Sequence, residues 1–246
     1  MKMKNIWLTP VLAVLCLAAS VSHAQERSRS LLRFETYTAD SLSLTGRFFP
    51  APVGDRPAAL LLHGRTRGVN QFMRLAERLQ RQGVPVVIPD LRGEGGSVRL
   101  LGREIEPAEQ WGGKERLILR RDLDHVMDFV LRQTGIPGRD WFIVAEGEAC
   151  AVAAELLAED ERFKRLVLLS PLLQEDFRLE TLEKAEAVFL VASTGDEPAG
   201  CDLERIAALL PDDVLRKALP AGRSRGQSIL RWEPGLLEDI AIWASP

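Results

Sequence analysis

The sequence predicts an α/β protein whose mainly parallel sheet is covered by helices on both faces. Short, continuous apolar runs alternate along the chain with longer segments whose apolar residues recur at helical spacing. Strands that are apolar throughout are buried on both sides, which is typical of parallel sheets packed between two helix layers. Neither an internal repeat nor a linker divides this pattern, so residues 25–246 are expected to form one domain.

The first 24 residues are expected to be a signal peptide. Lys2 and Lys4 precede a short apolar run, and Ser22-His23-Ala24 places small residues at a cleavage site. The run is short for a membrane span, which needs roughly 20 apolar residues; an uncleaved anchor is the alternative. We therefore expect an exported protein, periplasmic or secreted, that touches a membrane only through an uncleaved leader.

The first part of the mature chain predicts a hairpin and the start of the alternation. Residues 31–50 alternate partly around an Asp-Ser turn, which is typical of a hairpin. Residues 58–64 and 84–90 are continuous apolar strands, and residues 71–83 between them form a helix that ends at a glycine. A loop is expected from residue 92 to residue 113.

The remaining elements continue the alternation. Apolar runs predict strands at 140–146, 164–171, 187–194 and 213–222. The pattern at 213–222 is the weakest of the four. Helical spacing of apolar residues predicts helices at 114–135, 149–160, 178–185, 202–211 and 235–245. The helix at 178–185 is expected to be short. The segment between the strands at 164–171 and 187–194 is too short for a cap domain.

The charge, cysteine content and residue spacing limit the ligands and cross-links that the sequence predicts. The chain has 32 basic and 35 acidic residues, mixed along its length, so its net charge of −3 does not indicate nucleic-acid binding. Removal of the leader leaves Cys150 and Cys201; export permits a disulfide between them, but spacing alone cannot show one, and two free thiols are expected. No residue spacing predicts a metal site or a cofactor.

Four stretches in order resemble the α/β-hydrolase family. They are a His-Gly loop, an Asp-x-Arg-Gly loop, a strand–turn–helix and a strand followed by an acidic loop: LLLHGRTRG, IPDLRGEGGS, IVAEGEACAVAAELLA and LVASTGDEPAG. The likeness extends over residues 31–245. It implies an α/β-hydrolase fold without a cap domain, and an ester or peptide hydrolase site in which nucleophile, acid and histidine follow in that order.

The resemblance also implies that two members of the catalytic triad are replaced. The family turn Gly-x-Ser-x-Gly reads Ala145-x-Gly147-x-Ala149 here, so a glycine stands at the nucleophile position. Asp196 corresponds to the triad acid, and Arg225 stands where the family has its catalytic histidine. Arginine stays protonated and cannot act as a general base, so an Asp196–Arg225 ion pair is expected instead.

Other parts of the hydrolase site could persist. In the family, backbone N–H groups after the nucleophile and in the His-Gly loop bind the oxyanion, and these correspond to Arg65, Thr66 and Glu148. A carbonyl or carboxylate could bind there. Arg65, Arg67 and Arg225 could add positive charge, but they are expected to be merely solvated. The Asp-x-Arg-Gly loop is glycine-rich, but it lacks the phosphate-binding pattern and is expected to be a structural turn.

Other candidates for catalysis are weaker. Cys150 is expected to face the packed interior of the helix after the turn, and Ser170 and Ser193 follow strands without an evident base. Glu146 and Glu148 could form a carboxylate pair or a weak cation site, but are expected to be exposed turn residues. His63 is expected to be structural, and His125 is expected at the surface or packing edge of a long helix.

These observations predict an exported, catalytically degenerate pseudo-hydrolase that binds a small molecule or a protein. The alternative is an active ester or peptide hydrolase with a non-standard catalytic constellation. A purely structural or chaperone-like role stays open.

Overall fold

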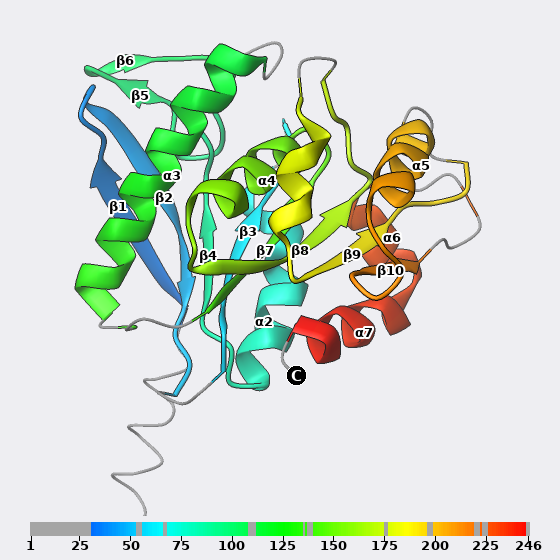
Figure 1. Ribbon diagram of the computed structural model, residues 1–246. Helices are drawn as coiled ribbons and strands as arrows, with labels where there is room; N and C mark the ends of the chain where they lie inside the picture. Colours follow the sequence, from blue (N-terminus) through cyan, green and yellow to red (C-terminus); the bar gives the residue numbers. More distant parts are fainter. Residues whose placement is uncertain are drawn as a thin grey trace, which may run out of the picture.

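A ten-stranded mixed sheet forms the centre of the computed structural model (Figure 1). The structure describes residues 31–52, 56–65, 68–107, 112–134, 136, 140–174, 177–195, 199–218, 222 and 226–244. The strands are β1 (Leu32–Tyr37), β2 (Leu42–Phe49), β3 (Ala58–Leu62), β4 (Val86–Pro89), β5 (Arg99–Leu100), β6 (Arg103–Glu104), β7 (Trp141–Glu146), β8 (Phe163–Leu169), β9 (Ala187–Val191) and β10 (Leu215–Ala218). Their order is β10-β9-β8-β7-β3-β4-β2-β5-β6, with β1 paired to β2. The six strands from β10 to β4 are parallel, and β1, β2, β5 and β6 are added antiparallel.

Helices cover both faces of the sheet (Figure 1). One face is covered by α3 (Gly113–Thr134), α4 (Ala149–Glu159), η2 (Leu179–Lys184) and α5 (Ala199–Leu209). The other face is covered by η1 (Val69–Phe72), α2 (Met73–Arg81), α6 (Gln227–Trp232) and α7 (Pro234–Ala244). Within the described ranges, no helix combines the length and the apolar character needed to cross a membrane.

The alternation of side chains along the central strands produces two hydrophobic cores. In β3, Leu60 faces the core under α3 and α4, whereas Leu61 faces the core under α2 and α7. The neighbouring strand β7 divides in the same way between Ile143 and Val144. Because both faces are covered, these strands need apolar residues at every position, which is the pattern seen in the sequence.

The structure confirms the expected fold class and corrects two details. The hairpin at 31–50 is present as β1 and β2, and the parallel strands and their helices follow in the expected order. The stretch 92–113 was expected to be a loop, but it contains the small hairpin of β5 and β6. The helix α6 was not predicted. Strands of two residues and a helix of six are too short for a period to be visible in sequence.

The glycine-rich stretch after β4 is a structural turn, as expected. Its centre is filled by the Asp90 carboxylate, which accepts hydrogen bonds from the Thr45 hydroxyl at 2.8 Å and the Gly96 N–H at 3.3 Å. Gly95 has a φ of +53°, and a Cβ atom at this position would lie 2.1 Å from Asp90 Oδ1. The loop therefore closes on its own carboxylate, which leaves no room for a phosphate.

Arg92, in the same turn, ties three parts of the chain together. Its guanidinium donates to both oxygens of Asp122 on α3, at 2.7 and 2.8 Å, and pairs with Asp40 of the β1–β2 turn at 3.0 Å. The Asp122 side chain is 7% exposed and that of Arg92 is 17% exposed. Bidentate pairs shielded from water are stronger than pairs at the surface.

We predict that Asp122→Ala lowers the free energy of unfolding by about 2–3 kcal/mol, because it leaves a shielded guanidinium short of its main acceptor. Asp128→Ala is the matched control on α3, since Asp128 lies 4.0 Å from Arg132 and both are over 60% exposed. It should cost less than about 0.5 kcal/mol. Urea denaturation of both variants measures the difference, and equal losses would contradict a special role for Arg92.

Candidate functional site

The loops after β3 and β7 meet where the chain reverses its direction of travel across the sheet. From β3 the chain moves to β4 on one side, and it later returns to the other side of β3 as β7. Open α/β sheets bind ligands outside the carboxyl ends of their strands at such a switch point. The candidate site is therefore built from these two loops and the segments packed against them.

Gly147, between β7 and α4, adopts a left-handed conformation with φ +59°. Its N–H donates to Leu169 O at 3.0 Å, and its carbonyl accepts from Leu172 N–H at 3.1 Å, so the end of β8 holds the turn in place. Among the described residues, a Cβ atom at this position would meet Leu172 Cδ1 alone, at 3.9 Å. The turn thus has the sharp geometry expected from the sequence.

Glu146, the last residue of β7, is 5% exposed. The expectation that it is an exposed turn residue was wrong. Its side chain lies between two glycines: a Cβ atom on Gly226 would lie 1.9 Å from Glu146 Oε1, and one on Gly64 would lie 3.4 Å from Glu146 Cγ. The absence of side chains at Gly64 and Gly226 makes space for this carboxylate behind the turn.

Ser170, directly after β8, lies on the other side of Gly226. Its Oγ accepts a hydrogen bond of 2.6 Å from the Gly226 N–H, and it is one of three non-glycine residues with positive φ in the described chain, at +47°. Ser170 and Ser193 are 4% and 3% exposed, so neither hydroxyl is presented to solvent. The sequence did not predict the hydrogen bond between Ser170 and Gly226. The only hint of it in the sequence is that a glycine follows Arg225.

Arg65 and Glu148 connect the two loops. Arg65 Nε lies 3.4 Å from Glu148 Oε2, and the two side chains are 34% and 17% exposed. The expectations that Arg65 is merely solvated and that Glu148 is an exposed turn residue are corrected by this pair. Glu148 is the N-cap residue of α4, where a negative charge interacts favourably with the helix dipole.

The two histidines of the described chain both form hydrogen bonds with residues other than Gly147. His63 is fully buried; its Nδ1–H donates to Gly64 O at 2.9 Å, and its Nε2 accepts from Leu91 N–H at 3.2 Å. Burial lowers the pKa of His63, so the ring is neutral. His125, on α3, lies 3.4 Å from Thr36 Oγ1 on β1. Both positions agree with the sequence expectation.

Cys150 is a free thiol buried in the first turn of α4. Its Sγ donates to Ala145 O at 3.4 Å, and burial, with a further contribution from Glu146, raises the pKa of Cys150 well above its ordinary value. The thiol is thus protonated and shielded, which is the opposite of a nucleophilic cysteine. It acts as a small apolar residue, as expected.

Three expected site residues, Thr66, Asp196 and Arg225, lie outside the described residues. The Asp196–Arg225 ion pair therefore stays a prediction. In the part of the chain that the structure describes, no group of three His, Cys, Asp or Glu side chains could hold a metal ion.

Comparisons with known proteins agree with the geometry. Residues 55–194 match the serine aminopeptidase S33 family. No curated protein matches the sequence significantly. The fold resembles a carboxyl esterase from Bacillus coagulans in complex with glycerol (10% identity, TM-score 0.68, 87% of this chain and 97% of that one). It also resembles a monoglyceride lipase from Saccharomyces cerevisiae (13%, 0.66, 88% and 95%) and the esterase Pf2001 from Pyrococcus furiosus (17%, 0.63, 89% and 90%).

We predict that alanine is tolerated far better at Gly147 than at Gly226, although both have positive φ. Gly147→Ala should cost about 1–2 kcal/mol for the left-handed conformation alone. Gly226→Ala adds a collision with the buried Glu146 carboxylate and should cost about 3–5 kcal/mol. Urea denaturation compares the two variants. Similar losses would mean that Glu146 moves aside easily.

The lowered pKa of His63 predicts a pH-dependent stability. Below the unfolded-state pKa of about 6.5 the unfolded chain takes up a proton that the folded chain does not. The stabilisation is therefore complete above about pH 6.5 and is lost as pH falls toward the folded-state pKa, by up to about 1.4 kcal/mol per pH unit. Urea midpoints between pH 7.5 and 5.5 should show a smaller slope in His63→Gln than in the wild type. An equal slope in His63→Gln and the wild type would contradict this role of His63.

Proposed function

Because the chain belongs to the serine aminopeptidase S33 family of α/β-hydrolases, we propose that it keeps the binding site of that fold without its chemistry. It would act by binding a small molecule or a protein. Gly147 carries this proposal: the turn that presents the nucleophile in the family has its conformation here, at φ +59°, but no hydroxyl.

The histidines support the same proposal. The sequence contains three, of which His23 lies in the expected leader. Both ring nitrogens of His63 are hydrogen-bonded to backbone groups, and His125 of α3 contacts Thr36 of β1. A general base must lie within hydrogen-bond reach of the group that it deprotonates, and among the described residues no hydrogen bond joins either ring to the β7–α4 turn.

The energetics of the turn favour loss of the nucleophile. A serine in the left-handed conformation carries about 1–3 kcal/mol of strain, which an active enzyme accepts in order to expose the hydroxyl. Glycine adopts the same backbone without that strain. Gly147 therefore stabilises the scaffold and removes the reactive group in one substitution.

The site would bind a carbonyl or a carboxylate. The oxyanion donors of the fold are backbone N–H groups, which survive any change of side chain. Their positions correspond to Glu148 after the turn and to Arg65 and Thr66 after β3. Arg65 adds a positive charge at this edge of the sheet, which Glu148 offsets in part at 3.4 Å.

We also propose that the protein is exported and works in the periplasm or outside the cell. The support is the leader-like pattern of residues 1–24. N-terminal sequencing of the protein recovered from its own host would test this, since a start at Gln25 is expected and an intact Met1 would contradict cleavage.

We predict that the purified protein neither reacts with a fluorophosphonate probe nor hydrolyses short-chain p-nitrophenyl esters, because no serine stands at position 147. Intact-mass spectrometry and ester absorbance measure the two properties, with an active serine esterase as the positive control. Stoichiometric labelling would establish the alternative, an active hydrolase with a non-standard constellation.

Restoring the missing groups tests the same site from the other direction. Gly147→Ser combined with Arg225→His should yield ester hydrolysis above the background of either single variant, because the turn has the conformation that presents the nucleophile in the family. Gly147→Ala combined with Arg225→His is the matched control, which lacks only the hydroxyl. Equal rates for the two double variants would mean that the site no longer has hydrolase geometry.

A further inference from the structure

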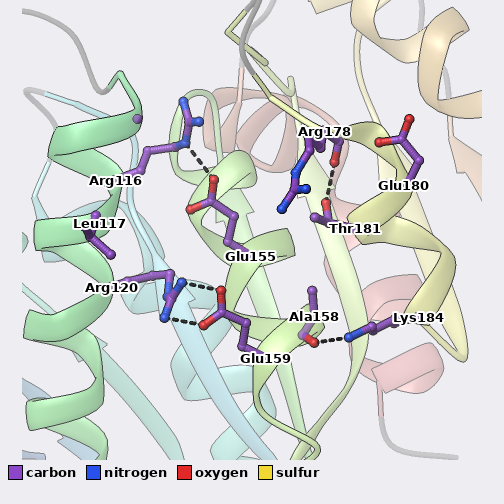
Figure 2. A pocket seen from close by; sticks show the side chains of 11 residues that line it. Arg116, Leu117, Arg120, Glu155, Ala158, Glu159, Arg178, Glu180, Thr181 and Lys184 are labelled. Carbon is purple, nitrogen blue, oxygen red and sulfur yellow. Dashed lines mark hydrogen bonds and ion pairs between the residues drawn. The ribbon is translucent and has the colours of Figure 1, made fainter.

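A second concave surface lies between α3, α4 and η2, away from the β7–α4 turn (Figure 2). This groove has a volume of about 790 Å³, within the usual range of ligand sites. Its floor is the second half of α4, from Glu155 to Glu159. At 1.5 Å per residue these positions lie roughly 12–18 Å along the chain from Gly147, so the groove is separate from the site proposed above.

The floor carboxylates are neutralised by one wall of the groove. Glu155 pairs with Arg116 Nε at 2.9 Å, and Glu159 pairs with Arg120 (Figure 2). The two arginines are four residues apart on α3, and the two glutamates are four residues apart on α4. Two successive ion pairs therefore link the two helices. Both carboxylates are therefore already paired with arginines of α3 and do not offset the charge of the cations on the opposite wall.

The opposite wall, η2 and the residue before it, carries two cations, Arg178 and Lys184, together with the acidic side chains of Glu180 and Glu183. Arg178, Thr181 and Lys184 recur every three residues, which is the period of a 3₁₀ helix, so they line the same side of the groove. Lys184 Nζ donates to the carbonyl of Ala158. Among the described residues, neither Arg178 nor Lys184 forms an ion pair with an acidic side chain.

Two further residues define the chemistry of the groove. Glu180 is the remaining carboxylate of the lining, and Figure 2 shows it on the side of η2 turned away from α4. Leu117 of α3 is 43% exposed and provides an apolar surface on the wall facing η2. The groove therefore offers two cations along one wall and an apolar contact on the other.

We propose that this groove docks an acidic, extended segment of a partner protein. At about 2.0 Å per residue, Arg178 and Lys184 lie roughly 12 Å apart along η2. In an extended peptide, residues four apart lie on the same face and are separated by about 13 Å. Two acidic side chains at that spacing would each meet one cation, while the intervening side chains contact Leu117. This interaction goes beyond ligand binding at the β7–α4 turn and uses none of its residues.

A fluorescein-labelled Gly/Ala peptide with two glutamates four residues apart tests the proposal by fluorescence anisotropy. The full chain should bind it, and the combined variant Arg178→Gln and Lys184→Gln should raise its Kd about tenfold, the effect of losing two exposed ion pairs. The same peptide with glutamines in place of the glutamates should bind at the level of that variant.

Arg74→Gln combined with Arg81→Gln is the matched control. Both arginines are exposed on α2, on the opposite face of the sheet, and their removal changes the net charge by the same amount. The Kd for the acidic peptide should stay at the wild-type value in this control. An unchanged Kd in the η2 variant, an equal loss in the α2 variant, or equal binding of the glutamine peptide would overturn the proposal.

Discussion

The buried carboxylate of Glu146 sets the spacing of the loops around the β7–α4 turn. It ends the central strand β7, and it occupies space that any residue larger than glycine at Gly226 would fill. Ser170 holds the same segment from β8 through a bond of 2.6 Å. Since Gly147 is hydrogen-bonded to Leu169, just before Ser170, and to Leu172, two residues after it, the turn, the end of β8 and the Gly226 segment are held together. A rigid frame of this kind favours ligand binding, because ordering loops on binding costs affinity.

The elements that the sequence predicts well are those long enough to show a period. Strands such as β3 and β7 are apolar at every position because each face meets a separate core, and α3 is long enough for its buried stripe to be visible. The β5–β6 hairpin and α6 fall below that length. Their positions depend on contacts with distant residues, such as the pairing of Leu42 with Leu100, which no local pattern encodes.

The candidate site divides in the same way. The turn at Gly147 follows from small residues between a strand and a helix, and the structural role of His63 follows from its place after β3. The burial of Glu146 could not be anticipated, because its neighbour Gly226 is far away in sequence and a glutamate beside a turn is normally solvated. The Arg65–Glu148 pair has the same origin, since only the adjacency of β3 and β7 brings the two residues together.

The pairing of β3 with β7 also constrains how the chain reaches its native state. Ala58 pairs with Trp141, and all five residues of β3 are fully buried. While β7 is unavailable, an apolar strand is left with one unpaired edge in the middle of the future sheet, and pairings of such long range form slowly. An unpaired edge of this kind readily takes up strands from other molecules. The chain would therefore be most prone to aggregation while it is incomplete, and a chaperone that covers β3 during synthesis would act where the exposure is greatest.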